Sequence, residues 1–288
     1  MTFRLPAFVC SLTFLTLSQW AGADEPLVKS GETIAFLGDS ITQGGAGHPG
    51  GYVQRVISGL EANDIKAKMI GAGIGGHKSN QMLERLERDV LSKKPEWMTL
   101  SCGVNDVWHG ANGVPLDAYE KNITEIVDKT QAVGIKVMIL TSTMIGEEAQ
   151  TDNNKKLAEY NAFLRKLATE KKCLLADLNA DMQAAIKPAA AGGKQVDRQL
   201  TSDGVHMGPL GDRLMAQGIL KAFGLSEAQL TKANEKWLDA PGTAGIHVNA
   251  NMTLRQYEKL SVLAHSRGLS VEQLVQEEAA KAIKTLVP

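Results

Sequence analysis

Residues 33–42 read Thr-Ile-Ala-Phe-Leu-Gly-Asp-Ser-Ile-Thr, an apolar run followed by a glycine and polar residues. The apolar run from Thr33 to Leu37 has the length and composition of a buried strand in a parallel sheet. Gly38 and Asp39 end the run, so Ser40 follows where the strand gives way to a turn or a helix. The stretch therefore predicts a parallel strand that carries polar side chains at its carboxyl end.

Short apolar runs continue to alternate with amphipathic stretches as far as Phe223, which is the pattern of βα units. The expected fold class is α/β, a three-layer α/β/α sandwich around a parallel sheet of five strands. The predicted strands are Thr33 to Leu37, Lys66 to Ile70, Trp97 to Cys102, Lys136 to Thr141 and Cys173 to Asp177. The predicted helices are Tyr52 to Ala62, Asn80 to Leu91, Leu116 to Ala132, Asn153 to Lys171, Asn179 to Lys187 and Leu210 to Phe223.

Polar and glycine-rich segments follow four of these strands. In open α/β sheets, ligands bind in the crevice beyond the carboxyl ends of the strands, so one edge of the sheet should collect the candidate chemistry. The segments are Gly38 to Thr42, Gly71 to Ser79, Gly103 to His109 and Thr141 to Gly146.

Composition narrows the class of protein. A chain of 288 residues with 43% hydrophobic residues can form one full-sized core with a small appendage. Its formal net charge of -1 is spread along the sequence, which does not favour nucleic acid or a membrane surface as partner.

Cys102 and Cys173 should lie at opposite ends of their strands, too far apart for a disulfide, so both are predicted to be free and buried.

The first 23 residues are typical of a secretory signal peptide. Arg4 is followed by a mostly apolar stretch and by a small-residue cleavage site at Ala21-Gly22-Ala23. A membrane anchor is the alternative, but this stretch is shorter than the span of about 20 apolar residues that a bilayer requires. We therefore expect an exported, soluble protein, periplasmic or extracellular, that begins near Asp24 and whose main domain covers residues 24–224.

The segment 225–245 has no strong hydrophobic period and contains Pro241-Gly242, so it is interpreted as a linker. Residues 246–288 then predict a small module, with a strand from His247 to Met252 and helices from Leu254 to Ser266 and Val271 to Thr285. This strand-helix-helix order resembles the ribbon-helix-helix fold, which implies a homodimer through residues 246–288. A helical hairpin packed on the main domain is the alternative. Five Lys or Arg residues against four Glu are too balanced for a phosphate-binding face.

Two motifs could supply nucleophilic catalysis. A serine held at the end of a strand, such as Ser40, can attack a carbonyl while its own N–H helps bind the oxyanion. In Asp203-Gly204-Val205-His206, the spacing lets the carboxylate hold one imidazole nitrogen while the other faces a nucleophile. Each motif also has an ordinary structural interpretation, as a helix cap or as a turn.

Two further segments offer donors for an oxyanion hole. Asn105 in Gly103-Val104-Asn105-Asp106 carries a side-chain amide, and Gly76 has a backbone N–H that no Cβ obstructs. Alternatively, Gly75-Gly76 is a turn and Asn105-Asp106 begins a helix.

Together these four blocks resemble the SGNH (GDSL-type) hydrolase family, which carries Gly-Asp-Ser, a glycine block, Gly-x-Asn-Asp and Asp-x-x-His in this order. The resemblance covers about Thr33 to Phe223 and implies a flavodoxin-like sheet and a serine esterase without a cofactor or metal. It implies Ser40 as nucleophile, His206 as base and Asp203 as its partner, with Ser40, Gly76 and Asn105 as the oxyanion hole. The sequence has Ile41 and Gly71 where many members have leucine and asparagine.

The residues around the predicted edge bear on the substrate. Polar and flat-sided residues suit a sugar-bearing ester better than a long acyl chain, which favours carbohydrate O-deacetylation. The candidates for substrate binding are Gln43, His77, Trp108 and His109. The alternatives are a lysophospholipase or short-chain lipid esterase, and a glycan-binding protein that does not turn its ligand over.

Overall fold

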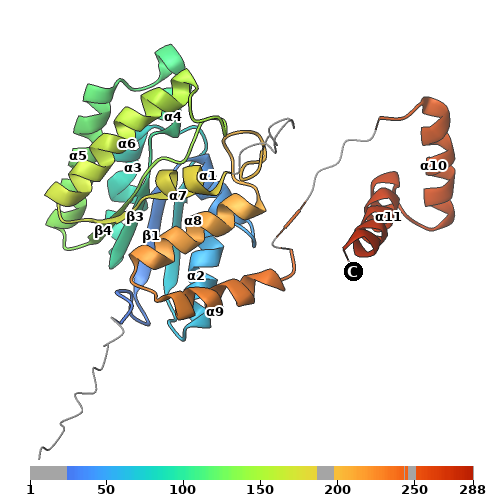
Figure 1. Ribbon diagram of the computed structural model, residues 1–288, viewed down its shortest axis with the longest axis horizontal. Helices are drawn as coiled ribbons and strands as arrows, with labels where there is room; N and C mark the ends of the chain where they lie inside the picture. Colours follow the sequence, from blue (N-terminus) through green and yellow to red (C-terminus); the bar gives the residue numbers. More distant parts are fainter. Residues whose placement is uncertain (1–24, 187–197, 243, 246–250, 288) are drawn as a thin grey trace, which may run out of the picture. The chain divides into compact units, whose positions relative to one another are not determined.

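The computed structural model describes residues 25–186, 198–242, 244–245 and 251–287 (Figure 1). The chain forms two compact units, of which the first ends at Ala244 and the second begins at Gly245. The predicted signal peptide, residues 1–23, lies outside the described residues.

The first unit is built on a sheet of five parallel strands in the order β2-β1-β3-β4-β5, which confirms the predicted α/β fold. The strand order reverses between β1 and β3, and in doubly wound sheets such a switch point is where ligands bind. Strand β2 begins two residues later than predicted, because Lys66 bonds to the turn at Ser30 and Gly31 instead of to β1. The strands are β1 Thr33–Gly38, β2 Lys68–Gly73, β3 Trp97–Ser101, β4 Lys136–Leu140 and β5 Leu174–Ala176.

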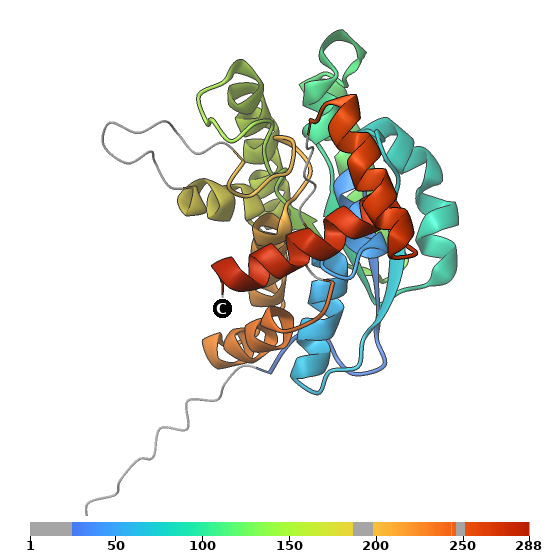
Figure 2. The same cartoon turned by 90° about the vertical axis from the view of Figure 1, so that its right-hand side faces the viewer.

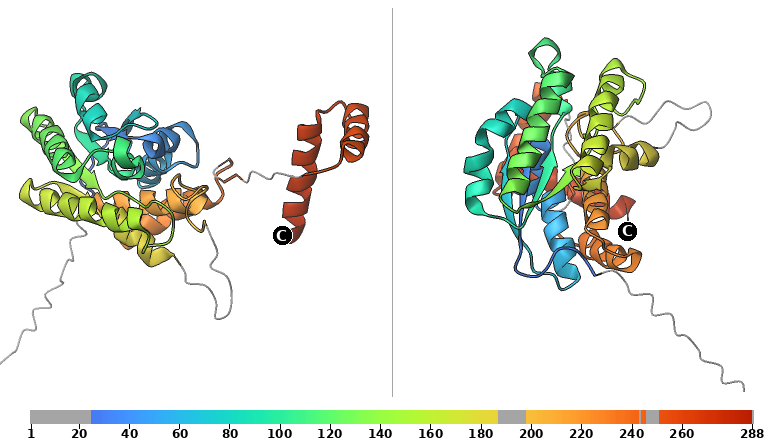
Figure 3. Two further views of the ribbon diagram at one scale, coloured as in Figure 1. Left: turned by 90° about the horizontal axis from the view of Figure 1, so that it is seen from above. Right: turned by 90° about the vertical axis from the view of Figure 1, so that its left-hand side faces the viewer.

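Helices cover both faces of this sheet, as the alternating pattern predicted (Figures 1 and 3). Helices α3, α5 and α6 pack side by side on one face, and α2 packs against α8 and α9 on the other. The helices of this unit are α1 Ser40–Gly47, α2 Tyr52–Ala62, α3 Ser79–Asp89, α4 Val104–Trp108, α5 Leu116–Ala132, α6 Asp152–Glu170, α7 Leu178–Ala185, α8 Pro209–Ala222 and α9 Glu227–Leu238, with 3₁₀ turns at Leu91–Lys93 and Gly110–Asn112.

The core lies where β1 meets both helical layers. All four residues from Ile34 to Leu37 are fully buried, so successive side chains contribute to opposite faces of the sheet. Phe36 meets Tyr52 of α2 edge to face, at 6.4 Å between ring centroids. Burial of both faces explains why this strand is a continuous apolar run without alternating polar residues.

Helix α9 corrects the interpretation of residues 225–245 as a linker. Ser226 and Gln229 form a capping box at its start, and Leu230, Ala233 and Trp237 are buried. The Trp237 indole N–H donates to Ser58 Oγ of α2 at 3.1 Å. Only three widely spaced apolar residues face the core, so the period is too weak to stand out against the polar residues between them.

The second unit contains two helices that form a hairpin, α10 Leu254–Ser266 and α11 Val271–Leu286 (Figure 2). Both begin at the predicted residue, and Ser270 and Gln273 form a capping box at the start of α11. Of the strand predicted from His247 to Met252, residues 247–250 lie outside the described residues, and Asn251 and Met252 are irregular.

Both cysteines of the described chain are free; Cys102 is buried, whereas Cys173 is only partly buried. Across the described ranges, every helix is too short or too polar to cross a membrane.

Candidate active site

Ser40 is the first residue of α1, directly beyond the carboxyl end of β1. The preceding residue, Asp39, caps this helix because its Oδ1 accepts a hydrogen bond of 2.9 Å from the N–H of Ile41. At the first position of a helix the backbone N–H has no intrahelical acceptor, so the N–H of Ser40 is available to a ligand. The Gly-Asp-Ser block therefore caps a helix and holds the Ser40 side chain at the carboxyl end of β1.

His206 and Asp203 lie in the short loop that precedes α8. The loop is closed by hydrogen bonds from Ser202 N–H to the His206 carbonyl at 2.8 Å and from Gly208 N–H to the Leu200 carbonyl at 2.8 Å. Asp203 Oδ1 accepts from the N–H groups of Val205 and His206, at 2.9 and 2.8 Å. These contacts fix which carboxylate oxygen faces the imidazole.

The structure brings Ser40, His206 and Asp203 together from distant parts of the chain. His206 Nε2 lies 2.9 Å from Ser40 Oγ, and His206 Nδ1 lies 2.7 Å from Asp203 Oδ2. Partial burial opposes ionisation of Asp203, but hydrogen bonds from the His206 side chain and from the two backbone N–H groups hold its pKa below the usual value. The carboxylate is therefore ionised at neutral pH, and the arrangement can move a proton from the serine to the imidazole.

The glycine loop after β2 lies beside Ser40. An ideal Cβ on Gly75 would stand 3.8 Å from Ser40 Cβ, and the N–H of Gly75 already donates to Gln43 Oε1 at 2.8 Å. Gly76 has a φ of +74°, a conformation that favours glycine. Since the N–H of Gly75 is bonded to Gln43, Gly76 stays the predicted donor of this loop.

Asn105 is buried in the first turn of α4, after Gly103 with its φ of +133°. Its amide nitrogen donates to the His77 carbonyl at 3.2 Å and lies 3.5 Å from Asp39 Oδ2. The second contact is at the limit of a hydrogen bond, so a bound oxyanion can replace it. Asn105 therefore connects the glycine loop to the turn that carries Asp39 and Ser40.

A second layer of carboxyl groups lies behind the site. Asp39 is 2% exposed, and burial raises its pKa to about 6, against the opposing hydrogen bond from Ile41; the nearby charge of Asp106 raises it further. Burial also raises the pKa of Asp106, whose Oδ1 accepts from the N–H of Ser79 at 2.9 Å. Asp106 thereby anchors the start of α3 to the turn after β3.

Arg85 is a buried residue behind the site that the sequence did not predict. Its guanidinium is buried and donates to the Gly38 and Ala72 carbonyls, each at 2.8 Å, and it pairs with Asp89 at 2.9 Å. It therefore ties together the carboxyl ends of β1 and β2. The available signal was an arginine on the same helical face as the apolar Met82 and Leu86.

The four residues predicted to bind substrate lie in different surroundings. Gln43 is exposed and supports the glycine loop, and His77 is half-buried with its carbonyl bonded to Asn105. Burial, together with the charge of nearby Arg85, lowers the pKa of His77. Trp108 is 45% exposed and stacks on His109, with ring centroids 6.1 Å apart. The last two form an exposed aromatic pair at the end of α4.

No group of three or more His, Cys, Asp or Glu side chains within the described ranges is arranged to hold a metal ion. The functional groups assembled at the switch point are thus a hydroxyl, an imidazole, a carboxylate and amide donors.

Comparison with known proteins agrees with this arrangement. Residues 36–214 match the model of the GDSL-like lipase/acylhydrolase family. The chain is similar to an acetylxylan esterase of Geobacillus stearothermophilus, with 27% identity over 68% of this chain and 96% of the relative. It is also similar to a lipoprotein of unknown role, YqeF of Bacillus subtilis, with 24% identity over 72% of this chain and 95% of the relative.

Among solved structures, the acetyl xylan esterase AlAXEase superposes with a TM-score of 0.61 and 36% identity, over 66% of this chain and 98% of that chain. The family match spans more than half of the sequence and includes the first three motif blocks and Asp203-x-x-His206. The chain therefore belongs to the GDSL-like lipase/acylhydrolase family, as the SGNH resemblance predicted, and is a carboxylic ester hydrolase.

Proposed function

We propose that this protein is an exported serine esterase that removes O-acetyl groups from carbohydrate, with Ser40, His206 and Asp203 as its triad. The observation that carries the proposal is the continuous contact from Ser40 Oγ through His206 to Asp203, at 2.9 and 2.7 Å. These groups meet at the switch point of the sheet, where this fold class binds its ligands.

In this mechanism, His206 takes the proton of Ser40 as its oxygen attacks the ester carbonyl. The negative charge that develops on the carbonyl oxygen is stabilised by the N–H groups of Ser40 and Gly76 and by the Asn105 amide. His206 then gives its proton to the departing sugar hydroxyl, which leaves an acyl group on Ser40. Water, activated by the same imidazole, attacks the acyl-enzyme and releases the acid.

The proposed substrate class rests on two kinds of support. Two proteins similar to this chain are named acetylxylan esterases. In addition, the exposed Trp108 and His109 pair offers a flat aromatic surface of the kind that sugar rings pack against, and the exposed Gln43 bonds to the glycine loop beside Ser40. A lysophospholipase or another short-chain lipid esterase is the alternative enzyme, and a non-catalytic glycan-binding protein is the alternative without turnover.

We expect the purified mature protein to release acetate from acetylated xylo-oligosaccharides at least about tenfold faster than it releases fatty acid from lysophospholipids. This ratio corresponds to a difference of about 1.4 kcal/mol between the two transition states. Acetate and fatty acid are quantified enzymatically at matched substrate concentrations. A preference for the lysophospholipid contradicts the carbohydrate assignment, and binding of the glycan without release of acetate contradicts catalysis.

Export is proposed from the signal-like pattern of residues 1–23, and similarity to a protein named as a lipoprotein supports it. N-terminal sequencing of the exported protein tests whether it begins near Asp24.

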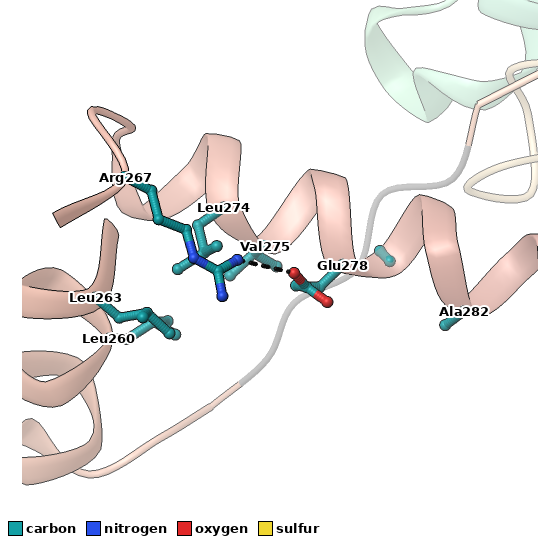
Figure 4. Close-up of a pocket in the computed structure, with 8 residues that line it drawn as sticks. Leu260, Leu263, Arg267, Leu274, Val275, Glu278 and Ala282 are labelled. Atoms are coloured by element: carbon teal, nitrogen blue, oxygen red, sulfur yellow. Dashed lines mark hydrogen bonds and ion pairs between the residues drawn. The ribbon is translucent and has the colours of Figure 1, made fainter. Parts of the chain in front are cut away.

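We also propose that the second unit associates with a second copy of the chain. Among its described residues only Ala264 and Leu274 are buried, and a unit of about 40 residues rarely sustains a core alone. An apolar groove runs between its helices, lined by Leu260, Leu263 and Leu274, with the Arg267–Glu278 ion pair at 3.2 Å across it (Figure 4). The same two helices carry further large exposed apolar side chains: Leu254, Tyr257, Val262, Val275, Ile283 and Leu286.

Removing residues 246–288 from the mature chain is expected to convert a dimer into a monomer, because these apolar faces would no longer be present. Light scattering coupled to size-exclusion chromatography measures the mass of both forms. A monomeric mass for the full mature chain contradicts the proposal, and the hairpin then has another role.

A further inference from the structure

Glu147 is a half-buried carboxylate in the loop between β4 and α6, outside the predicted site. Its Oε1 accepts from Leu200 N–H at 2.8 Å, Thr201 N–H at 2.7 Å and Thr201 Oγ1 at 2.7 Å. Its Oε2 accepts from Gln199 N–H at 2.6 Å. One side chain thus satisfies three consecutive backbone N–H groups at the start of the segment that carries Asp203 and His206.

The position of Glu147 is itself fixed by Asn154. This buried residue in the first turn of α6 accepts from Ile145 N–H at 2.9 Å. Its amide donates to the carbonyls of Ile145, Gly146 and Glu148 at 2.8 to 3.0 Å. The turn on either side of Glu147 is therefore held against a helix of the main core.

A second contact joins the same two loops closer to the triad. Gly146 N–H donates to the Gly204 carbonyl at 2.7 Å, and Gly204 lies between Asp203 and His206 in sequence. The segment from Leu200 to Gly208 is closed on itself by an antiparallel bridge between Thr201 and Met207. A displacement of Thr201 would therefore be transmitted across the bridge to the residues around His206.

We propose that Glu147 is a positioning residue that holds the Asp203–His206 loop in register with Ser40. The inference rests on the proposed triad. The four groups that surround the carboxylate are all donors, and an ionised carboxylate offers only acceptors. A glutamine could keep one acceptor oxygen, but its NH₂ group would face a backbone N–H; an alanine would leave all four donors without this partner.

The test compares Glu147→Ala and Glu147→Gln with the wild-type mature chain, using an aryl acetate and an acetylated xylo-oligosaccharide. Titration of the reactive serine with an organophosphate, carried to completion, counts competent sites, and kcat is expressed per titrated site. We expect kcat to fall about 10- to 100-fold in Glu147→Ala, with KM within about twofold, because a shift of about 1 Å between reacting groups costs about that much. Glu147→Gln should lie between this variant and the wild type.

Glu159→Gln and Glu159→Ala are the matched controls, since Glu159 is exposed on α6, and both should retain wild-type kcat. A purely structural role for Glu147 would lower the melting temperature or the number of titrated sites but leave kcat per site unchanged, and that result overturns the inference. Ser40→Ala is measured in parallel. If Ser40→Ala stays active, the proposed triad fails; if it is inactive while Glu147→Ala keeps full kcat per site, only the present inference fails.

Discussion

Replacing Ser40 with alanine is expected to lower kcat by about 10⁵- to 10⁶-fold, which is the loss that follows when a serine hydrolase cannot form its acyl-enzyme. The proposed oxyanion donors, which are the backbone N–H groups of residue 40 and Gly76 and the Asn105 amide, all remain in this variant, so a small residual rate above the uncatalysed reaction should persist. Release of acetate from an aryl acetate and from an acetylated oligosaccharide measures the loss. KM for either substrate should change little, because the Oγ atom reacts and contributes little to binding.

The Ser40 variant should remain folded, since within the described chain the Oγ atom of Ser40 contacts His206 Nε2 and not a residue of the core. Ser92→Ala is a suitable control, because Ser92 is an exposed serine whose hydroxyl donates to the Arg88 carbonyl near the amino end of β3. Comparable hydrolysis by Ser40→Ala and Ser92→Ala would refute the proposed nucleophile.

Asparagine in place of Asp203 is expected to lower kcat by about 10⁴-fold at neutral pH. The N–H groups of Val205 and His206 both donate to Oδ1, so the asparagine oxygen must occupy that position. Its NH₂ group then faces His206 Nδ1 and forces the imidazole proton onto Nε2. A protonated Nε2 cannot accept the proton of Ser40. The expected defect therefore comes from the wrong tautomer in an otherwise intact loop.

Asp128→Asn provides the comparison for this variant, because the side chains of Asp203 and Asp128 are 51% and 50% exposed and Asp128 pairs with Lys171 away from the site. Steady-state kinetics should show wild-type kcat for Asp128→Asn. Thermal unfolding should give similar melting temperatures for the two variants. Retention of more than about a tenth of wild-type kcat by Asp203→Asn would contradict the assigned role.

The sequence predicted the sheet and the position of the candidate triad because both depend on local patterns. The fully buried residues Ile34 to Leu37 had to be a continuous apolar run, and the polar blocks had to follow strands that share one edge. The first residues of helices α10 and α11, Leu254 and Val271, were also predictable, because the capping residues lie next to them in the sequence.

The features that the sequence did not predict depend on contacts between residues far apart in the chain. Helix α9 gains its stability from Trp237 packing on α2, although its own hydrophobic period is weak. Glu147 and Arg85 act through backbone groups of other segments, and a single sequence does not show which N–H or carbonyl a long side chain will reach. In the sequence alone, such residues cannot be distinguished from exposed charged residues.

The glycines at the carboxyl ends of β1 and β2 have a consequence for the rigidity of the site. A Cβ on Gly73 would overlap the backbone nitrogen of Gln43, and one on Gly38 would overlap the Thr42 hydroxyl. Main chain therefore packs directly on main chain where the donor loop meets the first turn of α1, and no side-chain rotamer can lengthen or shorten that contact. For the proposed oxyanion hole, this rigidity means that the donor dipoles would already be oriented in the free enzyme, so that little free energy is spent on reorienting them during the reaction.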